Sequence, residues 1–337
     1  MRNRRVGFAT GYDASLSVSD MSGWTRRADE LGFEMAFFSE TVELMRDSVT
    51  TLAAISMATK TLNIGCTQIV RLRSPLVMAQ TVASLDELSG GRMVLAPGAC
   101  TPSHARRYGL AAADPATSLR EWVEIMRRVL DRETVTFEGR TISIKNAELG
   151  WAPARRHVPM WIAATSRTGL RLAGQIGDGV LLNAICSPEY TVNAIRIVRE
   201  AVEESGRDWE KFEVAQLINC SIEDDEQSAI EAIRWEVASK FDPVQLPFIA
   251  GPKMRVGEPY IRKSDLPVFE AAWKSGGRDA LIRAVPDSYV IGMTASGTPQ
   301  KVTARVQEFR DAGVRLPILR PAAANQTERL LTLFGGD

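Results

Sequence analysis

Small residues gather where three strands of this sequence are expected to end. The segments are 65–69 (Gly-Cys-Thr-Gln-Ile), 97–101 (Pro-Gly-Ala-Cys-Thr) and 163–167 (Ala-Ala-Thr-Ser-Arg). Strand ends built in this way leave room for a flat ring to lie against the backbone. The alternative is that the small residues only let the strand ends pack closely on helices. The residues expected to line such a ring site are Gly65, Cys66, Thr67, Gln68, Gly98, Ala99 and Cys100.

A phosphate group could bind where the segment 163–167 leads into an expected helix. The hydroxyl groups of Thr165 and Ser166 and the free amides of the first helical turn could hold the anion, with Arg167 as the countercharge. A serine or threonine in this position is more commonly only an N-cap. The run Gly-Asp-Gly at 177–179 is equally well explained by a helix end and a tight turn, because a single Gly-x-Gly is not a dinucleotide-binding motif.

Few side chains near these strand ends could move a proton. Glu40 follows a predicted strand and could orient a substrate or donate a proton, although an acidic residue that begins a loop is commonly solvated. His104 lies just beyond the segment 97–101 and either faces the same pocket or is exposed to solvent. The sequence contains no Walker loop, no His-Glu-x-x-His motif and no Ser/His/Asp arrangement, so the residues for those hydrolytic mechanisms are missing.

The composition is that of an ordinary soluble protein. The 337 residues are 45% hydrophobic and 24% charged, and 41 basic side chains balance 41 acidic ones. A net charge of zero gives no reason to expect binding to nucleic acid or to an anionic membrane. No apolar run approaches the ~18 residues of a membrane-spanning helix, and the amino-terminal segment lacks the apolar stretch of a signal peptide. We therefore expect a cytoplasmic protein.

The four cysteines do not form a metal-binding pattern. They are widely spaced, without a Cys-x-x-Cys pair, and only two histidines accompany them, so no metal site is expected. Each cysteine lies in or just after an apolar run and is expected to be a buried, reduced thiol. Cys100 is the exception to test, because it follows one of the small-residue strand ends.

The elements that must position these residues alternate along the chain. Short apolar runs predict strands at 6–10, 35–38, 62–69, 93–96, 160–164, 179–182, 214–219 and 316–319. Amphipathic segments predict helices at 19–31, 49–59, 75–88, 119–131, 168–176, 188–205, 226–241 and 299–312. Eight parallel strands with crossover helices close into a (β/α)8 TIM barrel of about 250 residues, whose sites form at the carboxyl ends of the strands. A single domain spanning residues 1–337 explains the length, with roughly ninety residues left for insertions.

Two insertions interrupt the predicted barrel, at about residues 133–150 and 242–290. The first is predicted to be a β-hairpin on the rim, built around the Glu-Gly-Arg turn at 138–140. The second precedes the last helix and strand, is rich in proline, and could contain short helices at 266–274 and 278–285. It is interpreted as a lid over the site, with dimer contacts or disorder as alternatives.

Six segments match the sequence patterns of one family. They are 28–33 (Ala-Asp-Glu-Leu-Gly-Phe), 85–92 (Leu-Asp-Glu-Leu-Ser-Gly-Gly-Arg), 158–165 (Val-Pro-Met-Trp-Ile-Ala-Ala-Thr), 171–180 (Arg-Leu-Ala-Gly-Gln-Ile-Gly-Asp-Gly-Val), 297–302 (Gly-Thr-Pro-Gln-Lys-Val) and 309–314 (Phe-Arg-Asp-Ala-Gly-Val). On these residues the chain resembles the luciferase-like flavin- and deazaflavin-dependent oxidoreductases, from about residue 5 to residue 320. Within that family it is most similar to the methylenetetrahydromethanopterin-reductase-like branch, whose coenzyme is F420.

The resemblance implies the same barrel, with a coenzyme at the carboxyl ends of the strands. The ring would lie near a bulge after the third strand, at Cys66, Thr67 and Gln68, with a cis peptide bond between Thr67 and Gln68. Phosphate binding is implied for Ala164, Thr165, Ser166, Gly177, Asp178 and Gly179. Bound F420 would exchange a hydride with a carbon of a small organic substrate. A homodimer is also implied, for which the helices at 49–59 and 75–88 are the expected surfaces.

The sequence leaves two other functions open. One is an FMN-dependent monooxygenase of the same family, which would need oxygen and a flavin reductase as partner. The other is a barrel that binds a flavin without catalysis.

Two departures from the family pattern bear on the chemistry. Cys100 stands where the family often has the second glycine of a Gly-x-Gly, so its thiol is expected either to narrow the ring site or to give the substrate a soft contact. Thr41 follows Glu40 where the F420-dependent sugar-phosphate dehydrogenases have a histidine, which disfavours that substrate class. The candidate catalytic residues are Glu40, Thr41 and His104.

Overall fold

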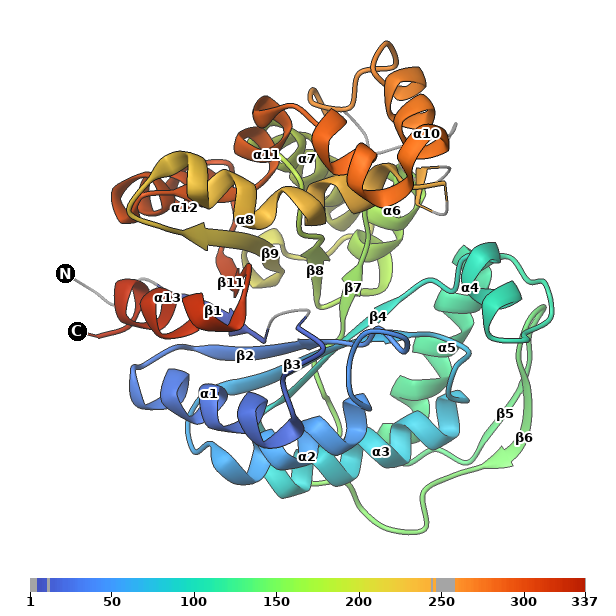
Figure 1. The fold of residues 1–337 in the computed structure, drawn as a ribbon. Helices are drawn as coiled ribbons and strands as arrows, with labels where there is room; N and C mark the ends of the chain where they lie inside the picture. The colour runs from blue at the N-terminus through green and yellow to red at the C-terminus, as the bar shows by residue number, and fades with distance from the viewer. Residues whose placement is uncertain (1–4, 11–12, 244, 247–257, 337) are drawn as a thin grey trace.

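Eight parallel strands form the centre of the molecule in a computed structural model that describes residues 5–10, 13–243, 245–246 and 258–336 (Figure 1). The strands are β1 (Gly7–Ala9), β2 (Met35–Ser39), β3 (Asn63–Ile69), β4 (Met93–Gly98), β7 (Trp161–Ala163), β8 (Gly179–Leu182), β9 (Glu213–Ile222) and β11 (Leu316–Pro321). They pair in the order β11-β1-β2-β3-β4-β7-β8-β9, and β9 pairs again with β11. Because the sheet closes on itself, the predicted (β/α)8 barrel is confirmed.

Helices connect the strands on the outside of the barrel. The connecting helices are α1 (Val18–Glu30), α2 (Ser48–Ala58), α3 (Pro75–Ser89), α4 (Pro102–Arg107), α5 (Pro115–Leu130), α6 (Arg167–Ile176), α7 (Pro188–Glu204) and α12 (Pro299–Asp311). The last barrel helix, α13 (Thr327–Phe334), follows β11 and was not predicted. It was missed because it is short and because no strand follows it, so the sequence does not show a further β/α repeat there. Short 3-10 turns lie at Trp209–Lys211, Ser239–Phe241 and Ala324–Gln326.

Alternate residues of each strand belong to two apolar cores. Phe8 and Leu95 pack with residues of the crossover helices in an outer core. Ala9, Ala96 and Leu217 belong to a second, inner core inside the barrel. The division follows from the pleat of a strand, which points successive side chains to opposite faces. It therefore identifies which side chains face the interior of the barrel and which face the helices.

The turn between α3 and β4 shows how local sequence sets the elements. The side chain of Ser74 caps the start of α3, and Gly90 ends the helix in the left-handed conformation, with φ of 72°. Buried Asp86 accepts hydrogen bonds from Arg155 Nε (2.9 Å) and from the backbone N–H of Met93 (3.1 Å). Backbone conformation and a buried ion pair therefore fix the same turn.

The second insertion covers the carboxyl end of the barrel and is larger than the predicted 242–290, because it begins with α8 and ends with β10. Its elements are α8 (Glu226–Ala238), α10 (Leu266–Ala284), α11 (Asp287–Met293) and β10 (Ala295–Gly297). β10 pairs with the last residues of β9, which places the insertion at that end. Ile233 and Val237 of α8 and Phe269 of α10 join the inner core. The helices lie together at the top of Figure 1, in yellow and orange. Residues 244 and 247–257 of the predicted insertion lie outside the described residues.

Two features of this insertion bear on the predictions. The segment 226–241 is helical as predicted, but it is not a barrel helix, because α8 packs against α11, β10 and the inner core. The chain between β9 and β11 contains more than one helix. The alternation of helices and strands in the sequence does not reveal which of these helices packs on the outside of the barrel. α10 contains both predicted short helices, which meet at Gly276 and Gly277, where the backbone is not helical.

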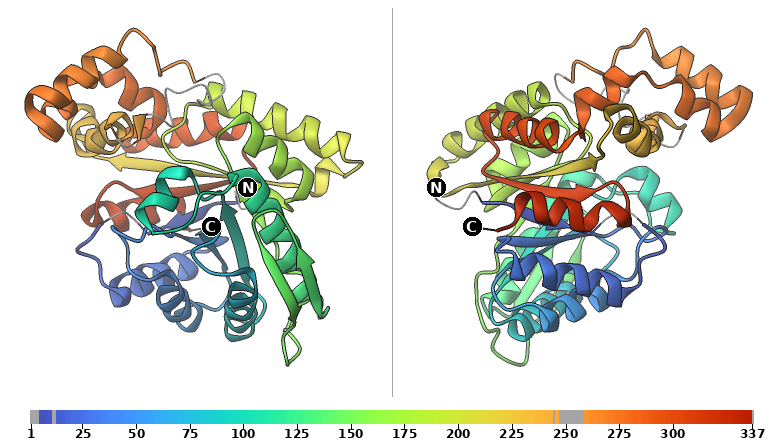
Figure 2. Two further views of the ribbon diagram at one scale, coloured as in Figure 1. Left: turned by 90° about the vertical axis from the view of Figure 1, so that its right-hand side faces the viewer. Right: turned by 60° about the vertical axis from the view of Figure 1, so that its left-hand side comes forward.

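The first insertion is the predicted hairpin, β5 (Val135–Glu138) and β6 (Ser143–Ala147). It runs beside α5, as the green segment in Figure 2 shows, and Glu121 of α5 holds its turn. The carboxylate of Glu121 accepts hydrogen bonds from the backbone N–H groups of Arg140 (2.7 Å) and Thr141 (2.9 Å). It also accepts from the N–H of Ile142 (3.0 Å). A Cβ on Gly139 would lie 2.5 Å from Cδ of Glu121, so the turn requires glycine there.

We expect Glu121→Gln to reduce the free energy of unfolding by about 1–2 kcal/mol at neutral pH and to flatten its dependence on pH. Burial raises the pKa of Glu121, but the hydrogen bonds from Thr141 and the turn amides outweigh it, and the pKa is lowered. A lowered pKa in the folded state means that the stabilisation is complete above the unfolded value of about 4.3 and is lost as the pH falls through the folded value. Urea unfolding between pH 3 and pH 7 measures the difference.

The matched control is Glu124→Gln, which changes an exposed carboxylate on the same helix. Parallel pH profiles for wild type and Glu121→Gln would contradict the role of this carboxylate as the anchor of the hairpin.

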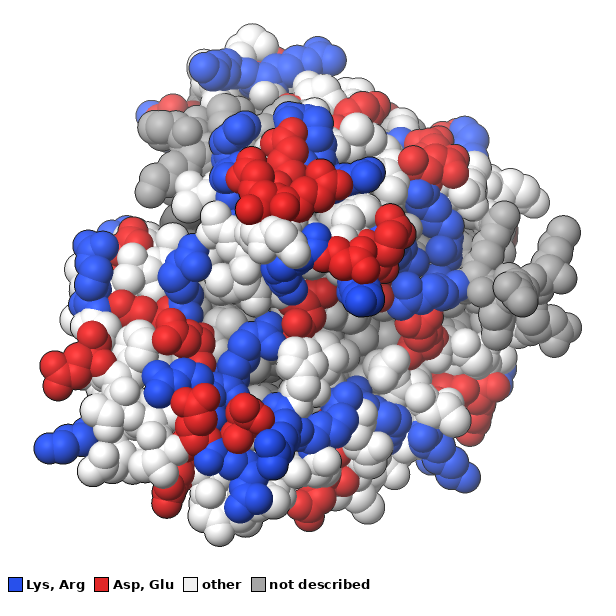
Figure 3. Space-filling model, turned by 180° about the vertical axis from the view of Figure 1, so that it is seen from behind, with Lys and Arg blue, Asp and Glu red and all other residues white. Residues whose placement is uncertain are grey.

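None of the helices in the described ranges is both long and apolar enough to cross a membrane. The described residues also contain no group of three or more His, Cys, Asp or Glu side chains that could hold a metal ion. Basic and acidic side chains are intermixed over the face shown in Figure 3, as equal numbers of the two would allow.

Candidate active site

Small side chains from β3, β4 and β7 line one side of the barrel mouth. Gly65 faces the interior, because a Cβ there would lie 2.4 Å from Cδ2 of Phe37, a residue of the inner core. Thr67 lies on the same face of β3, two residues on. Gly98 and Ala163 are register partners on adjacent strands, and a Cβ on Gly98 would lie 3.5 Å from the Cβ of Ala163. The structure therefore brings these predicted residues together.

Three of the predicted ring-site side chains do not face this mouth. Cys66 is fully buried in the outer core, and burial raises the pKa of its thiol. Gln68 Nε2 donates a hydrogen bond to Ser48 Oγ (3.1 Å) at the start of α2. Cys100 packs in the outer core too, and burial raises the pKa of its thiol, although Arg71 opposes this. The side chains of these three residues therefore point away from the mouth, and the Cys100 thiol does not narrow it. That their backbone contacts the coenzyme stays a prediction, as it does for the half-buried Ala99, which lies between Gly98 and Cys100.

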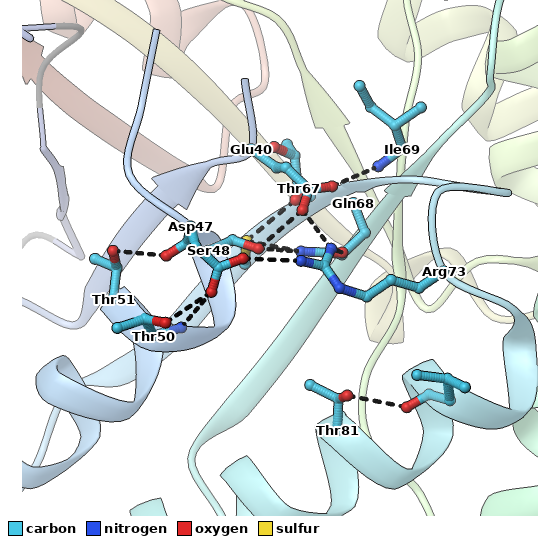
Figure 4. A network of polar contacts seen from close by, with 12 residues as sticks. Glu40, Asp47, Ser48, Thr50, Thr51, Thr67, Gln68, Ile69, Arg73 and Thr81 are labelled. Carbon is cyan, nitrogen blue, oxygen red and sulfur yellow. Dashed lines mark hydrogen bonds and ion pairs between the residues drawn. The ribbon is translucent and has the colours of Figure 1, made fainter. Parts of the chain in front are cut away.

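The carboxylate of Glu40 is held by a network behind the mouth (Figure 4). Its side chain is 6% exposed and pairs with Arg73, whose Nη1 lies 2.5 Å from Oε1. Ser48 Oγ donates to the same oxygen (2.9 Å), and the backbone N–H of Ile69 donates to Oε2 (3.3 Å). Arg73 also donates to Gln68 Oε1 (2.9 Å). Glu40 therefore joins the loops after β2 and β3, and the structure does not bring its carboxylate into the mouth.

The loops after β2 and β3 are joined at further points. Thr67 Oγ1 accepts a hydrogen bond from the backbone N–H of Glu40 (2.8 Å), which fixes the orientation of the threonine. Thr41, the residue after Glu40, is half-buried. Arg71 adopts a left-handed φ of 79° and donates from Nη2 to the carbonyl of Ala111 (2.7 Å). A non-glycine residue in this conformation is held there by its surroundings, and such residues concentrate at functional sites.

His104 lies on α4, directly after the carboxyl end of β4. Its ring stacks on Tyr108, with the ring centroids 6.1 Å apart. Burial lowers the pKa of His104, and the nearby Glu43 opposes this shift. Nδ1 is buried and has no hydrogen-bond partner among the described residues. His104 therefore lies at the correct end of the barrel for the catalytic role predicted for it, and that role stays a prediction.

The residues after β7 form the predicted start of a helix. Ser166 accepts a hydrogen bond from the backbone N–H of Gly169 (3.2 Å), which makes it the N-cap of α6. The backbone N–H of Ala164 bonds across to β8, and the carbonyl of Thr165 accepts from Tyr190 Oη (2.9 Å). These residues lie beside the small-residue wall, at the end of the barrel where the helix N-terminus could attract an anion.

The other predicted phosphate residues lie at the opposite end of the barrel. Gly177 and Asp178 precede β8, which begins at Gly179. Asp178 Oδ2 accepts hydrogen bonds from the N–H of Met160 (2.9 Å) and from Arg127 (2.9 Å). A Cβ on Gly177 would lie 2.7 Å from a backbone oxygen, so close packing explains the glycine. A cavity of about 320 Å³ beside Arg127 and Met160 belongs to this amino end as well. The prediction that residues 177–179 share a phosphate site with Ser166 is wrong.

The sequence did not reveal a buried polar cluster across the mouth. Arg320 of β11 and Asn219 of β9 lie on the inner faces of their strands, and Arg320 Nε donates to Asn219 Oδ1 (3.0 Å). Glu236 of α8 forms an ion pair with Arg320 and accepts a hydrogen bond from Asn219. Asn219 and Arg320 are polar residues in otherwise apolar strands, and this pattern in the sequence could have indicated a polar cluster. Nothing in the sequence places Glu236 beside them.

All peptide bonds in the described residues are trans. The cis bond that the resemblance implied between Thr67 and Gln68 is therefore absent from this structure.

Residues 5–316 match the family described as luciferase-like monooxygenase. The chain belongs to this family. The resemblance inferred from the six sequence segments is thereby confirmed. The match extends through seven of the eight barrel strands and reaches the first residue of the eighth, β11.

Relatives within and around this family are similar over nearly their whole length. A 5,10-methylenetetrahydromethanopterin reductase of Archaeoglobus fulgidus is 25% identical over 335 residues, which cover 97% of each chain. An F420-dependent glucose-6-phosphate dehydrogenase of Nakamurella multipartita is 25% identical over 342 residues, 96% of this chain and 94% of that one. The solved structure of the F420-dependent tetrahydromethanopterin reductase from Methanopyrus kandleri superimposes with a TM-score of 0.83 at 23% identity, covering 98% and 97% of the two chains. The last comparison confirms the fold.

Proposed function

We propose that this protein is an oxidoreductase that transfers a hydride between coenzyme F420 and a small organic substrate. The observation that carries the proposal is the wall of small residues at the ends of β3, β4 and β7, beside the N-terminus of α6. The relatives named as F420-dependent enzymes support the choice of coenzyme.

The residues of the mouth fit a flat coenzyme that carries a phosphate. Gly98 places no side chain in the mouth, and Ala163 adds only a methyl group, so a ring can lie against the ends of β4 and β7. The space in front of Gly65 is filled by the ring of Phe37. Ala164, Thr165 and Ser166 lead into α6, whose N-terminus would hold the phosphate. When bound, F420 supplies a carbon that accepts or donates a hydride. The protein aligns coenzyme and substrate, and the helices α8 and α10 cover the mouth and exclude water.

The second candidate function is an FMN-dependent monooxygenase with a flavin reductase as partner. The observation that favours it is the likeness to oxygen-using relatives, among them a long-chain alkane monooxygenase whose structure superimposes with a TM-score of 0.75 at 13% identity. The same wall of small residues would accept FMN, because both coenzymes present a flat tricyclic ring. The fold therefore does not separate the two coenzymes.

Titration of the purified protein with F420 and, separately, with FMN separates these functions. We expect saturable binding of F420, followed by a change in its fluorescence, and binding of FMN that is at least about tenfold weaker. Tight binding of FMN without binding of F420 would replace the first proposal with the second. Failure to bind either coenzyme would contradict both.

We further propose that the protein is a homodimer that associates through α2 and α3, which pack side by side. Large apolar side chains are exposed on these helices, with Met57 72%, Val77 49% and Leu88 44% exposed. Exposed apolar residues that gather on adjacent helices are typical of protein interfaces. The cytoplasmic location stays a prediction from the sequence.

We expect Val77→Glu to shift the protein from dimer to monomer in sedimentation experiments, because a carboxylate would be buried in the interface. The control is Val192→Glu on α7, where a valine that is 53% exposed lies on another part of the surface. An unchanged dimer for Val77→Glu would place the interface elsewhere.

A further inference from the structure

A buried carboxylate from the insertion lies inside the mouth of the barrel. The side chains of Glu236 and Arg320 are each only 4% exposed, and the two form an ion pair. Asn219 contacts both of them. Arg320 and Asn219 lie near the carboxyl ends of β11 and β9, on the inner faces that Ile318 and Leu217 share. Because Glu236 reaches these inner faces from α8, its carboxylate lies within the covered mouth.

This cluster faces the wall of small residues. In the closed order of eight strands, β11 lies opposite β4 and β9 lies opposite β3. Gly98 of β4 and Thr67 of β3 are part of the small wall. A ring that lies against the small wall therefore has the cluster of Glu236 on its other side. That is the side from which a substrate would approach the ring.

One oxygen of Glu236 has no partner. Oε2 accepts from Arg320 and from Asn219, whereas Oε1 is buried and has no hydrogen-bond partner among the described residues. Leaving a carboxylate oxygen buried without a hydrogen bond is costly, so such an atom needs an explanation, and a bound ligand that donates a hydrogen bond to it is one. An acceptor oxygen of this kind selects a ligand that carries an N–H or O–H donor.

We propose that Glu236 is a specificity-determining residue, whose Oε1 accepts a hydrogen bond from an N–H or O–H group of the substrate. Arg320 and Asn219 hold the carboxylate in place through its other oxygen. The inference deepens the proposed function, on which it rests for the position of the ring. It also gives the insertion a defined task, since α8 supplies a polar contact that the barrel strands do not.

The test compares two probes of nearly the same shape, cyclohexanol, which donates a hydrogen bond, and cyclohexanone, which only accepts. Each is titrated into the F420-loaded protein, and binding is followed by the fluorescence of the coenzyme. We expect wild type to bind cyclohexanol about tenfold more tightly than cyclohexanone, the ratio typical of a hydrogen bond to a charged group. No preference for the donor in wild type would overturn the proposal.

The decisive variant is Glu236→Gln. Because Arg320 requires an acceptor, the glutamine amide must keep its oxygen toward Arg320 and turn its NH2 group into the mouth. The preference should therefore reverse, with cyclohexanone bound more tightly than cyclohexanol. A merely structural role for Glu236 would weaken both probes equally and would not reverse their order. An unchanged preference in Glu236→Gln would also overturn the proposal.

Two controls keep the outcome interpretable. Glu231→Gln changes an exposed carboxylate on the same helix and should leave the preference of wild type intact. If Glu236→Gln does not fold, the double variant Glu236→Met/Arg320→Met removes both charges, and it should bind the two probes equally. The affinity for F420 is measured first. If F420 does not bind, the proposed function fails, and the same probes are titrated into the free protein by tryptophan fluorescence, where the preference for the donor still tests Glu236.

Discussion

Replacing Arg320 with methionine is expected to lower the free energy of unfolding by about 3–5 kcal/mol, more than any other single charge change considered for this chain. The substitution leaves the carboxylate of Glu236 buried, with its side chain 4% exposed and without its cation. The hydrogen bond from Asn219 remains but cannot replace the charge of the guanidinium. Urea unfolding at pH 7, followed by circular dichroism, measures the loss.

Two matched variants separate this effect from the loss of a large side chain. Glu236→Met/Arg320→Met removes both charges together, and replacement of a complete buried pair by apolar residues is often neutral or stabilising, so the double variant should recover most of the loss. Arg196→Met breaks an exposed pair with Glu200 on α7 and should cost less than about 1 kcal/mol. If Arg320→Met lowers the free energy of unfolding by no more than Arg196→Met does, the pair of Arg320 and Glu236 does not behave as a buried ion pair.

The barrel could be predicted from the sequence because each repeat carries its own signals. The turn from α3 to β4 is an example, since Ser74, Gly90 and the apolar run of β4 each act over a few residues. The assignment of α8 failed for the opposite reason. Its helical pattern is local and was recognised, but its position over the mouth depends on contacts with β10, α11 and the inner core, which are distant in the chain.

The candidate site, like the fold, could be predicted from the sequence only in part. Small residues at strand ends are visible in the sequence, and Gly65, Gly98 and Ala163 do lie together in the mouth. Which residues of β3 face inward depends on the register of the strand within the closed sheet, so the sequence did not show that the side chains of Cys66 and Gln68 face outward. The segment 177–179 was wrongly included because a Gly-Asp-Gly turn has the same appearance at either end of a strand.

The proposed coenzyme site makes Gly98 the most informative position to change. We expect Gly98→Val to weaken F420 binding by at least about a hundredfold, because its side chain would occupy the space between β4 and the ring. The fold should tolerate the change. A Cβ on Gly98 meets the Cβ of Ala163 at 3.5 Å, an ordinary contact, and valine is favoured in strands. The binding constant is measured by titration with F420, and the free energy of unfolding by urea.

Gly65→Ala is the contrasting variant on the neighbouring strand. Its Cβ would lie 2.4 Å from Cδ2 of Phe37, whose ring is fully buried in the inner core and has no space to move. We expect this variant to lose about 1–3 kcal/mol of stability, the cost of overpacking a core. The pair therefore separates two reasons for a glycine in a barrel strand. If Gly65 is small because of Phe37 and Gly98 because of a ligand, only Gly98→Val loses the coenzyme while keeping the fold. Equal F420 binding by Gly98→Val and wild type would move the coenzyme away from the small-residue wall.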